Sequence, residues 1–415
     1  MVAVGPFRSL RPTADSAQRV LALPYDVMNV AEAREMAVGR PDSFLHVSRA
    51  EIDLDESTNP YDDAVYARSG AALTEFINRG VLRLDDEPTV SVYRMRMGDL
   101  EQVGLVLAAS VDDYEAGIIR KHELTRPDKE NDRVRHIEGV GAHDEPVFLL
   151  SPPDERIASF LDAVVTGAPA NYAAVSEMGI SHEVWVVSDA GQINTVVSAI
   201  ADMPALYIAD GHHRSAAAQR VRDARREQHG ADADLGTADQ FLAVVVPADQ
   251  VTLMPYHRAV ADLSGLTSAQ FLAAVGESFA VEAVGEAIAP TSLREFGMYY
   301  DGQWYRLRST IEHADDVLDV DVLQADLLEP VLGIGDPRRD QRLHFVGGIR
   351  GLPELERLVD EGHDAVSFSL MPTSVAQLVA VADRGEIMPP KSTWFEPKLG
   401  SGLFLHPLPE RLPAS

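Results

Sequence analysis

One segment decides the expected fold: Ala205-Leu-Tyr-Ile-Ala-Asp-Gly-His-His-Arg-Ser-Ala-Ala-Ala-Gln219. Its first five residues are an apolar run of strand length, and the small residues from Ser215 onward favour a helix. Gly211 lies between the two, where it permits a tight turn and a close approach of the backbone to a ligand. A helix that starts there directs free N–H groups and the positive end of its dipole at the turn. The segment therefore predicts a strand, an anion-binding turn and a helix.

Strands and helices alternate along the chain on both sides of this segment. Helical stretches lie between several apolar runs of strand length, and this interleaving predicts an α/β fold with a buried sheet. The predicted elements are a short helix capped by Asn29 and Glu32, the helices Tyr61–Asn78, Glu155–Val165, Ile193–Ile200, Ser215–Gln228, Pro353–Val359 and Ser374–Asp383, the hairpins Thr89–Met97 with Gln102–Val111 and Met298–Leu307, and the strands Pro146–Leu150, His182–Val187, Leu206–Ala209 and Phe241–Val246.

The composition excludes several classes of protein. The chain has 415 residues, a net charge of −29 and no cysteine, so disulfides, thiolate metal sites and cysteine nucleophiles are excluded. The acidic charge disfavours nucleic acid and anionic membranes as partners. Because no apolar run suits a signal peptide or a bilayer span, we expect a cytoplasmic protein. The length suggests two or three domains, and we expect regions over 1–110, 111–250 and 251–415.

The residue types in the turn favour a phosphorylated ligand. Arg214 carries a planar fork of donors that suits phosphate oxygens, and the two histidines add further donors. Asp210, at the carboxyl end of the strand, has the chemistry to orient a histidine or to hold Mg²⁺ through water. In the alternative interpretation, Asp210 and Ser215 only cap the turn and the histidines are surface polar groups. We interpret Asp210 as a catalytic and metal-binding residue. The residues that we interpret as phosphate-binding are Gly211, His212, His213, Arg214 and Ser215.

This Asp-Gly-His-His-Arg turn, followed by a helix of small residues, resembles the phosphate-binding box of the ParB/sulfiredoxin superfamily. More narrowly, it resembles the box of free serine kinases, which phosphorylate L-serine with ADP or ATP. The resemblance implies a ParB/sulfiredoxin-like α/β core in the middle of the chain, over 111–250, with mixed α+β N- and C-terminal regions packed on it. Sulfiredoxin chemistry needs a cysteine in the box, and it is excluded because the chain has none. The net charge of −29 argues against the DNA-binding ParB branch.

A second segment, Ile118-Ile-Arg-Lys-His-Glu-Leu-Thr-Arg-Pro-Asp-Lys129, resembles the kinase segment that supplies a carboxylate base. The resemblance implies that Glu123 is the general base, although Lys121 replaces the proline of the family pattern. It also favours substrate-binding roles for His122, Lys129 and Arg133, within a basic island that runs to Arg135. Two alternatives remain open: this stretch is the exposed start of a helix at Pro127-Asp128, or a zinc site forms from His122, His136 and His143, at a spacing that matches no compact ligand pattern.

Segments over nearly the whole chain resemble a bacterial family catalogued as a domain of unknown function, number one thousand and fifteen. They are Leu23-Pro-Tyr-Asp26, the segment around Glu123, the loop at 209–214 and Met388-Pro-Pro-Lys-Ser-Thr-Trp-Phe-Glu-Pro-Lys398. The last of these either folds over the active site as a flap or docks its aromatic side chains on the core.

Together these features predict a phosphotransferase that acts between a nucleotide (ADP or ATP) and a small hydroxyl compound, with free L-serine as the preferred acceptor and Mg²⁺ as cofactor. Two alternatives use the same loop. One is dephosphorylation of phosphoserine at the same site, and the other is a regulatory protein that binds a nucleotide without catalysis. The regulatory protein would need the phosphate loop but not Glu123. The sequence predicts neither the direction of transfer nor the oligomeric state.

Overall fold

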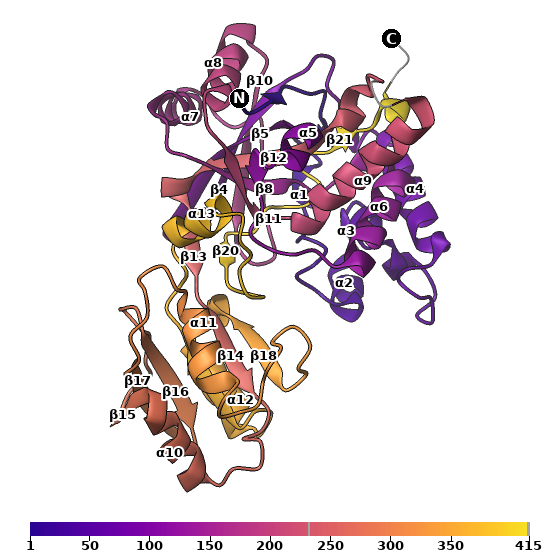
Figure 1. Cartoon of the computed structure of the whole chain (residues 1–415). Helices are drawn as coiled ribbons and strands as arrows, with labels where there is room; N and C mark the ends of the chain where they lie inside the picture. Colours follow the sequence, from indigo (N-terminus) through magenta and orange to yellow (C-terminus); the bar gives the residue numbers. More distant parts are fainter. Residues whose placement is uncertain (231–232, 413–415) are drawn as a thin grey trace. The chain divides into compact units, whose positions relative to one another are not determined.

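The fold is described from a computed structural model that describes residues 1–230 and 233–412 (Figure 1). The chain forms two compact units, of which the larger contains Met1–Val251 and the residues from Pro397 onward. The smaller unit contains Thr252–Glu396. This division differs from the three regions expected from the sequence, because strands on both sides of residue 110 belong to one sheet. Sequence patterning identifies strands but does not identify their neighbours in a sheet.

The larger unit is built on a sheet of nine strands. These are β1 (Val4–Gly5), β4 (Val90–Met97), β5 (Leu100–Ser110), β6 (Ile119–Arg120), β8 (Val147–Ser151), β9 (Tyr172–Val175), β10 (Ser181–Val187), β11 (Leu206–Asp210) and β12 (Gln240–Pro247). Their order is β6-β11-β8-β12-β5-β4-β10-β9, and β1 pairs with β5. The pairs β6–β11 and β8–β12 are parallel, whereas the other pairs are antiparallel. The α/β class expected from the sequence is confirmed.

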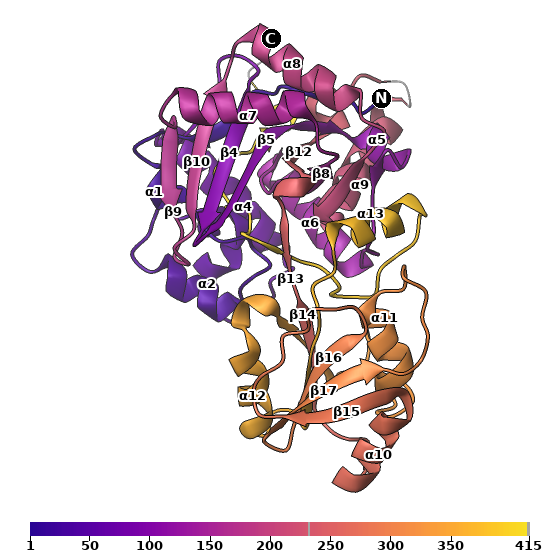
Figure 2. The same ribbon diagram turned by 90° about the vertical axis from the view of Figure 1, so that its left-hand side faces the viewer.

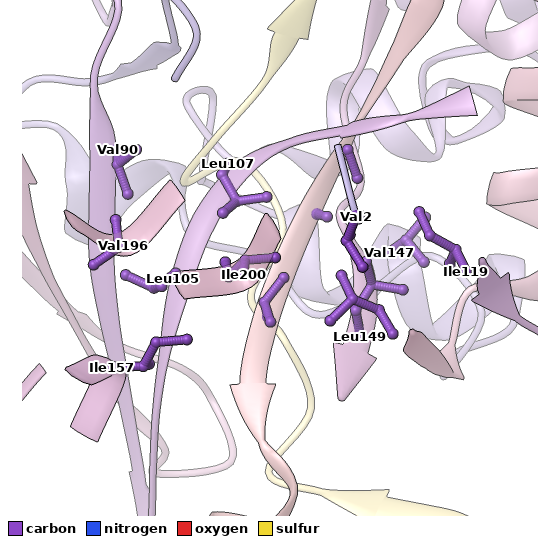
Figure 3. Packing of buried hydrophobic residues seen from close by; sticks show 14 of the residues in the cluster. Val2, Val90, Leu105, Leu107, Ile119, Val147, Leu149, Ile157, Val196 and Ile200 are labelled. Atoms are coloured by element: carbon purple, nitrogen blue, oxygen red, sulfur yellow. The ribbon is translucent and has the colours of Figure 1, made fainter. Parts of the chain in front are cut away.

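The central strands are continuously apolar because both of their faces are buried. On β5, Leu105 and Leu107 face a core that contains Ile157 and Val196 from two helices (Figure 3). These helices are α7 (Glu155–Gly167) and α8 (Ala190–Ala201), which lie side by side over this face of the sheet (Figure 2). Each fully buried side chain of this size contributes about 1.5–3 kcal/mol to stability. This core therefore fixes the strands whose ends carry the candidate site.

In the same unit α6 (Pro127–Val140) packs against both α4 (Asp63–Asn78) and α9 (His212–His229). Two glycines allow α4 and α6 to approach closely, because a Cβ atom on Gly70 would lie within 2.3 Å of the Gly139 carbonyl oxygen. The remaining elements are β2 (Leu10–Pro12), α1 (Ala17–Val20), α2 (Val30–Ala37), α3 (Leu45–Ser48), β3 (Leu82–Leu84), α5 (Val111–Glu115), β7 (Ala142–His143) and β21 (His406–Pro407). The expected capping box at the start of α2 is confirmed.

The smaller unit has an antiparallel sheet of six strands in the order β15-β17-β16-β19-β14-β18. Its strands are β13 (Thr252–Met254), β14 (Tyr256–Val260), β15 (Phe279–Val284), β16 (Glu295–Tyr300), β17 (Gln303–Ser309), β18 (Leu343–Gly347), β19 (Val366–Ser369) and β20 (Trp394–Glu396), and its α-helices are α10 (Ser268–Ser278), α11 (Asp319–Leu323), α12 (Leu352–Asp360) and α13 (Val375–Asp383). The hairpin expected near Asp301 is confirmed as β16–β17. Across the described residues of both units, every helix lacks the length or the apolar character needed to cross a bilayer.

Candidate functional site

The candidate site lies where two parallel strands end at one edge of the large sheet. Leu206 and Tyr207 of β11 pair in parallel with Ile119 and Arg120 of β6. The carboxyl ends of parallel strands meet at the same edge, so the segment after β6 runs beside the turn after β11. The two sequence segments that carry the predicted chemistry therefore come together, although about ninety residues separate them.

The turn after β11 depends on a β-bulge and on Gly211. The register between β11 and β8 shifts between Ile208 and Asp210, as bulges often do beside active sites. Gly211 then adopts a φ of 99°, and a Cβ atom there would lie 3.0 Å from Nε of Arg214 and 3.3 Å from Cα of Val147. Only glycine meets both conditions without strain.

The helix after the turn begins earlier than the sequence suggested. It starts at His212 rather than at Ser215, so the two histidines and Arg214 occupy its first turn. Ser215 is fully buried, and its hydroxyl donates to the carbonyl oxygens of Gly211 (3.4 Å) and His212 (3.0 Å). Its hydroxyl thus serves the helix backbone, and the phosphate-binding role expected for Ser215 stays a prediction. The helix starts early because positive φ at Gly211 already supplies the change of direction.

His212 connects the turn to the segment that contains Glu123. Its Nε2 accepts a hydrogen bond from the backbone N–H of His122 at 3.4 Å, so the proton of the neutral ring resides on Nδ1. Nδ1 lies 3.9 Å from Oε2 of Glu123, whose side chain is 42% exposed. Burial, together with the neighbouring His122, lowers the pKa of His212 well below its usual value. His212 therefore presents an N–H donor, without a positive charge, on the side of Glu123.

His122 is buried against His212. Their ring centroids are 4.6 Å apart at an interplanar angle of 88°. Burial lowers the pKa of His122 to about 4, so this ring is also neutral at neutral pH. Among the described residues, neither ring nitrogen of His122 has a hydrogen-bond partner of normal geometry. Such a buried polar group costs free energy unless a ligand or water binds it.

His213 of the turn and Lys129 of the second segment have different partners. The Nε2 of His213 accepts from the backbone N–H of Arg126 at 3.1 Å, and burial lowers the pKa of this half-buried histidine. Lys129 contacts the Tyr61 hydroxyl at 3.0 Å on the surface. The expected opening of a helix at Pro127 is confirmed. The side chains of the basic island thus have different partners, while the charges of Lys129 and Arg126 also act on His213 of the turn. The substrate-binding roles expected for Lys129 and Arg133 stay predictions.

Arg133 is buried and joins the turn at residues 23–26 to this region. Its guanidinium pairs with Asp132 at 2.7 Å and lies 3.9 Å from the centroid of the Tyr25 ring. Burial raises the pKa of Tyr25, and the charges of Arg133, Asp26 and Arg214 also act on this hydroxyl. The 23–26 segment, which the sequence marked only through the family resemblance, therefore lies within electrostatic reach of the phosphate turn.

Asp210 is held as a carboxylate by two cations. Its Oδ1 accepts from the backbone N–H of Gly211 at 2.9 Å, and its Oδ2 lies 3.5 Å from Arg214 and 3.4 Å from Lys398. Burial alone would raise the pKa of Asp210, but the charges of Lys398 and Arg214 outweigh burial and hold it well below its usual value. Arg214 also donates to the carbonyl oxygen of Pro146. The sequence had marked Lys398 only as part of a flap or a docked tail.

A buried acidic pair, missed at the sequence level, lines a small void together with Arg214. Asp144 contacts His136 at 2.8 Å, whereas Glu145 accepts from the Ser401 hydroxyl at 2.6 Å. Burial and the adjacent Asp144 raise the pKa of Glu145 to about 8. Both acids line a void of about 10 Å³, room for about one water molecule, together with Arg133, His136 and Arg214. The polar run His-Asp-Glu-Pro directly before an apolar strand was the signal available in the sequence.

The three histidines of the zinc alternative have separate partners. His122 lies against His212, His136 contacts Asp144, and the ring of His143 stacks on that of His406. Across residues 1–230 and 233–412, no three His, Asp or Glu side chains form a cluster able to hold a metal ion. Asp210, predicted to bind Mg²⁺, is therefore a single carboxylate at the turn.

The sequence matches the family described as protein of unknown function (DUF1015) over residues 4–326, well over half of the chain. The chain belongs to this family. The resemblance drawn from the motifs along the sequence is thereby confirmed at the level of the family. A search of curated proteins found no match.

Similar solved structures include free serine kinases. A free serine kinase mutant in complex with ADP has a TM-score of 0.35 and 14% identity, and the alignment covers 70% of this chain and 87% of that chain. A conserved hypothetical protein from Pyrococcus furiosus has a TM-score of 0.34 and 14% identity, with coverage of 72% and 94%. SbnI with a C-terminal truncation, from Staphylococcus aureus, has a TM-score of 0.36 and 11% identity, with coverage of 72% and 87%.

Proposed function

We propose that this protein is a phosphotransferase that moves a phosphoryl group between a nucleotide, ADP or ATP, and the hydroxyl of free L-serine. The observation that carries the proposal is the position of Glu123, whose carboxylate lies 3.9 Å from His212 in the first turn of α9. In phosphoryl transfer to a hydroxyl, a positioned carboxylate can orient the attacking hydroxyl and accept its proton. The two parallel strands β6 and β11 supply this juxtaposition.

The phosphates of the nucleotide would bind at the turn that links β11 to α9. The first backbone N–H groups of α9 precede its first intrahelical bond, from Ser215 N–H to the Gly211 carbonyl, and are available to an anion. His212 and His213 add neutral donors, and Arg214 adds a fixed positive charge. We also propose that this unit of strand, glycine turn and helix is a ParB/sulfiredoxin-like phosphate box. The positive φ of Gly211 supports that assignment.

The transfer step follows from this arrangement. The acceptor hydroxyl attacks the terminal phosphorus, Glu123 takes the hydroxyl proton, and the phosphorus–oxygen bond to the nucleotide breaks as the bond to serine forms. The negative charge on the transferred group needs donors that are already in place. His212 would be such a donor, because its Nδ1 lies 3.9 Å from Glu123. We propose the same role for His122, whose buried ring packs against that of His212.

The donor set at the turn fits Mg²⁺ bound mainly through the substrate. In phosphoryl-transfer sites Mg²⁺ is held by one or two carboxylates, substrate phosphates and water, rather than by a cage of protein ligands. Asp210 is an ionised carboxylate at the turn and would hold the ion there. When bound, Mg²⁺ would neutralise charge on the phosphates.

The proposal is tested by incubating the purified protein with Mg²⁺, L-serine and either ADP or ATP, and by detecting phosphoserine with mass spectrometry. The reverse reaction is tested from phosphoserine with AMP or ADP, and dephosphorylation from phosphoserine alone. We expect phosphoserine in at least one forward assay. Nucleotide binding without product in any assay would overturn the proposal in favour of a regulatory nucleotide-binding protein.

A further inference from the structure

Lys398 reaches the phosphate turn from the C-terminal part of the chain. Its Nζ lies 3.4 Å from Oδ2 of Asp210, a residue 188 positions earlier. The residues that follow it are anchored in the larger unit: the backbone N–H of Gly400 donates to the Tyr93 hydroxyl at 3.0 Å, and Ser401 pairs with Ala22 as an isolated β-bridge. Because residues 399–406 are buried, the backbone at Lys398 has a fixed position.

A bound polyphosphate needs more positive charge than the turn itself supplies. In His212 and His213 one ring nitrogen already accepts a backbone N–H, from His122 and Arg126 respectively, so each ring has only one nitrogen left for a phosphate. Arg214 donates to the Pro146 carbonyl and pairs with Asp210, so part of its donor capacity is already used. Lys398 brings a second full positive charge to the same carboxylate.

Lys398 is also the more accessible of the two cations. Its side chain is 22% exposed, whereas that of Arg214 is 9% exposed. A lysine ammonium carries three donors on a flexible stem, so it can turn from a carboxylate to a nearby phosphate without movement of the backbone. Hydrogen bonds between an ammonium and a phosphate oxygen are among the strong, charge-assisted kind.

We propose that Lys398 is a ligand of the terminal phosphate of the nucleotide, and that its ammonium stays on the phosphoryl group during transfer. The inference rests on the proposed function, which supplies the nucleotide. Lys398 forms no covalent bond and keeps its proton, while the hydroxyl proton goes to Glu123. In the absence of the phosphate, Asp210 holds the ammonium at the turn.

The test compares nucleotides that differ in the number of phosphates. The affinities of AMP, ADP and ATP are measured by isothermal titration calorimetry for the wild type, Lys398→Met and Lys398→Arg. Lys391→Met serves as a matched control, because this exposed lysine lies in the smaller unit and contacts the Tyr256 ring. We expect Lys398→Met to lower the affinity for the nucleotide that carries the transferred phosphate tenfold or more. The affinity for the nucleotide that lacks this phosphate should fall less than twofold. Lys398→Arg should retain most of the affinity.

An equal loss for all three nucleotides, or no loss for any, would overturn the role of Lys398. A thermal melt without ligand shows whether each variant is folded. If Lys398→Met does not fold, Lys398→Arg decides the test. The inference then requires that Lys398→Arg prefer the same nucleotide among the three as the wild type does. If the wild type binds nucleotides and transfers the phosphoryl group, and Lys398→Met does both equally well, only this inference is overturned. If the wild type binds all three nucleotides but yields no phosphoserine, the proposed function is overturned. The titrations then decide separately whether Lys398 contacts the phosphate.

Discussion

Two groups of cations invite comparison: the basic island between Lys121 and Arg135, and the pair formed by Arg214 and Lys398. The first group is compact in sequence but its members have different partners, since Lys129 contacts Tyr61 and Arg133 contacts Asp132. The second group is far apart in sequence but meets at one carboxylate. Neighbouring residues on a helix point in different directions, whereas packing of the buried C-terminal segment in the larger unit brings Lys398 to the turn. Proximity in sequence is therefore a poor guide to a charged site.

The largest effect is expected from Glu123→Gln. The substitution removes the base but keeps the size of the side chain, so turnover should fall about 10²- to 10⁴-fold. Nucleotide affinity should change less than twofold, because Glu123 is proposed to act on the acceptor hydroxyl and the phosphates are proposed to bind the N–H groups and cations of the turn. The measurement is phosphoserine formation by mass spectrometry, with Asp128→Asn, an exposed carboxylate paired with Arg126, as the control. Undiminished turnover in Glu123→Gln would remove this residue from the mechanism.

A smaller effect is expected from Gly211→Ala. Positive φ alone costs an alanine about 1–2 kcal/mol, and the new Cβ would also press on Arg214 and Val147. Gly230→Ala is a matched control, because Gly230 has a φ of 107° with no atom within 4 Å of the added Cβ among the described residues. Urea denaturation should show a larger loss for Gly211→Ala, and only this variant should lose nucleotide affinity. Equal losses in stability and unchanged affinity would show that the turn does not shape the phosphate site.

Glu145→Gln should change how stability depends on pH. The carboxyl has a pKa of about 8 in the folded protein against about 4.5 in the unfolded chain, so the folded state binds more protons between these values. The free energy of unfolding of the wild type should therefore fall as pH rises from about 5 to 8, by up to about 1.4 kcal/mol for each unit of pKa shift. Denaturation curves at several pH values should show a weaker fall for Glu145→Gln. Glu75 forms a surface ion pair with Arg68, and Glu75→Gln should keep the wild-type slope of unfolding free energy against pH. The same slope in Glu145→Gln as in the wild type would contradict the raised pKa of Glu145.

The smallest effect is expected from Lys129→Met. Its ammonium contacts a surface tyrosine rather than the turn, so ADP affinity and stability should stay within twofold and about 0.5 kcal/mol of the wild type. Titration calorimetry of ADP measures the first quantity and urea denaturation the second. A tenfold loss of affinity would return Lys129 to the substrate-binding role that the sequence indicated and would narrow the contrast with Lys398.

Local signals predicted the elements that carry the site. The apolar run that ends at Asp210, the glycine after it and the small residues of the helix were sufficient for the strand, the turn and α9. The same local reasoning placed the helix start three residues late, because a propensity pattern does not report the φ of Gly211. Lys398 and Glu145 could not be assigned, since no periodicity links them to the turn.

The sequence alone determined the absence of thiol chemistry, the acidic balance and the family, because composition and motifs are properties of the chain itself. Tertiary structure decided which of these residues meet. Side-chain periodicity is a short-range property that reports the buried face of one element, whereas strand pairing and helix packing depend on the whole core. For that reason Glu123 reaches the turn through β6 and Lys398 reaches it through a buried C-terminal segment.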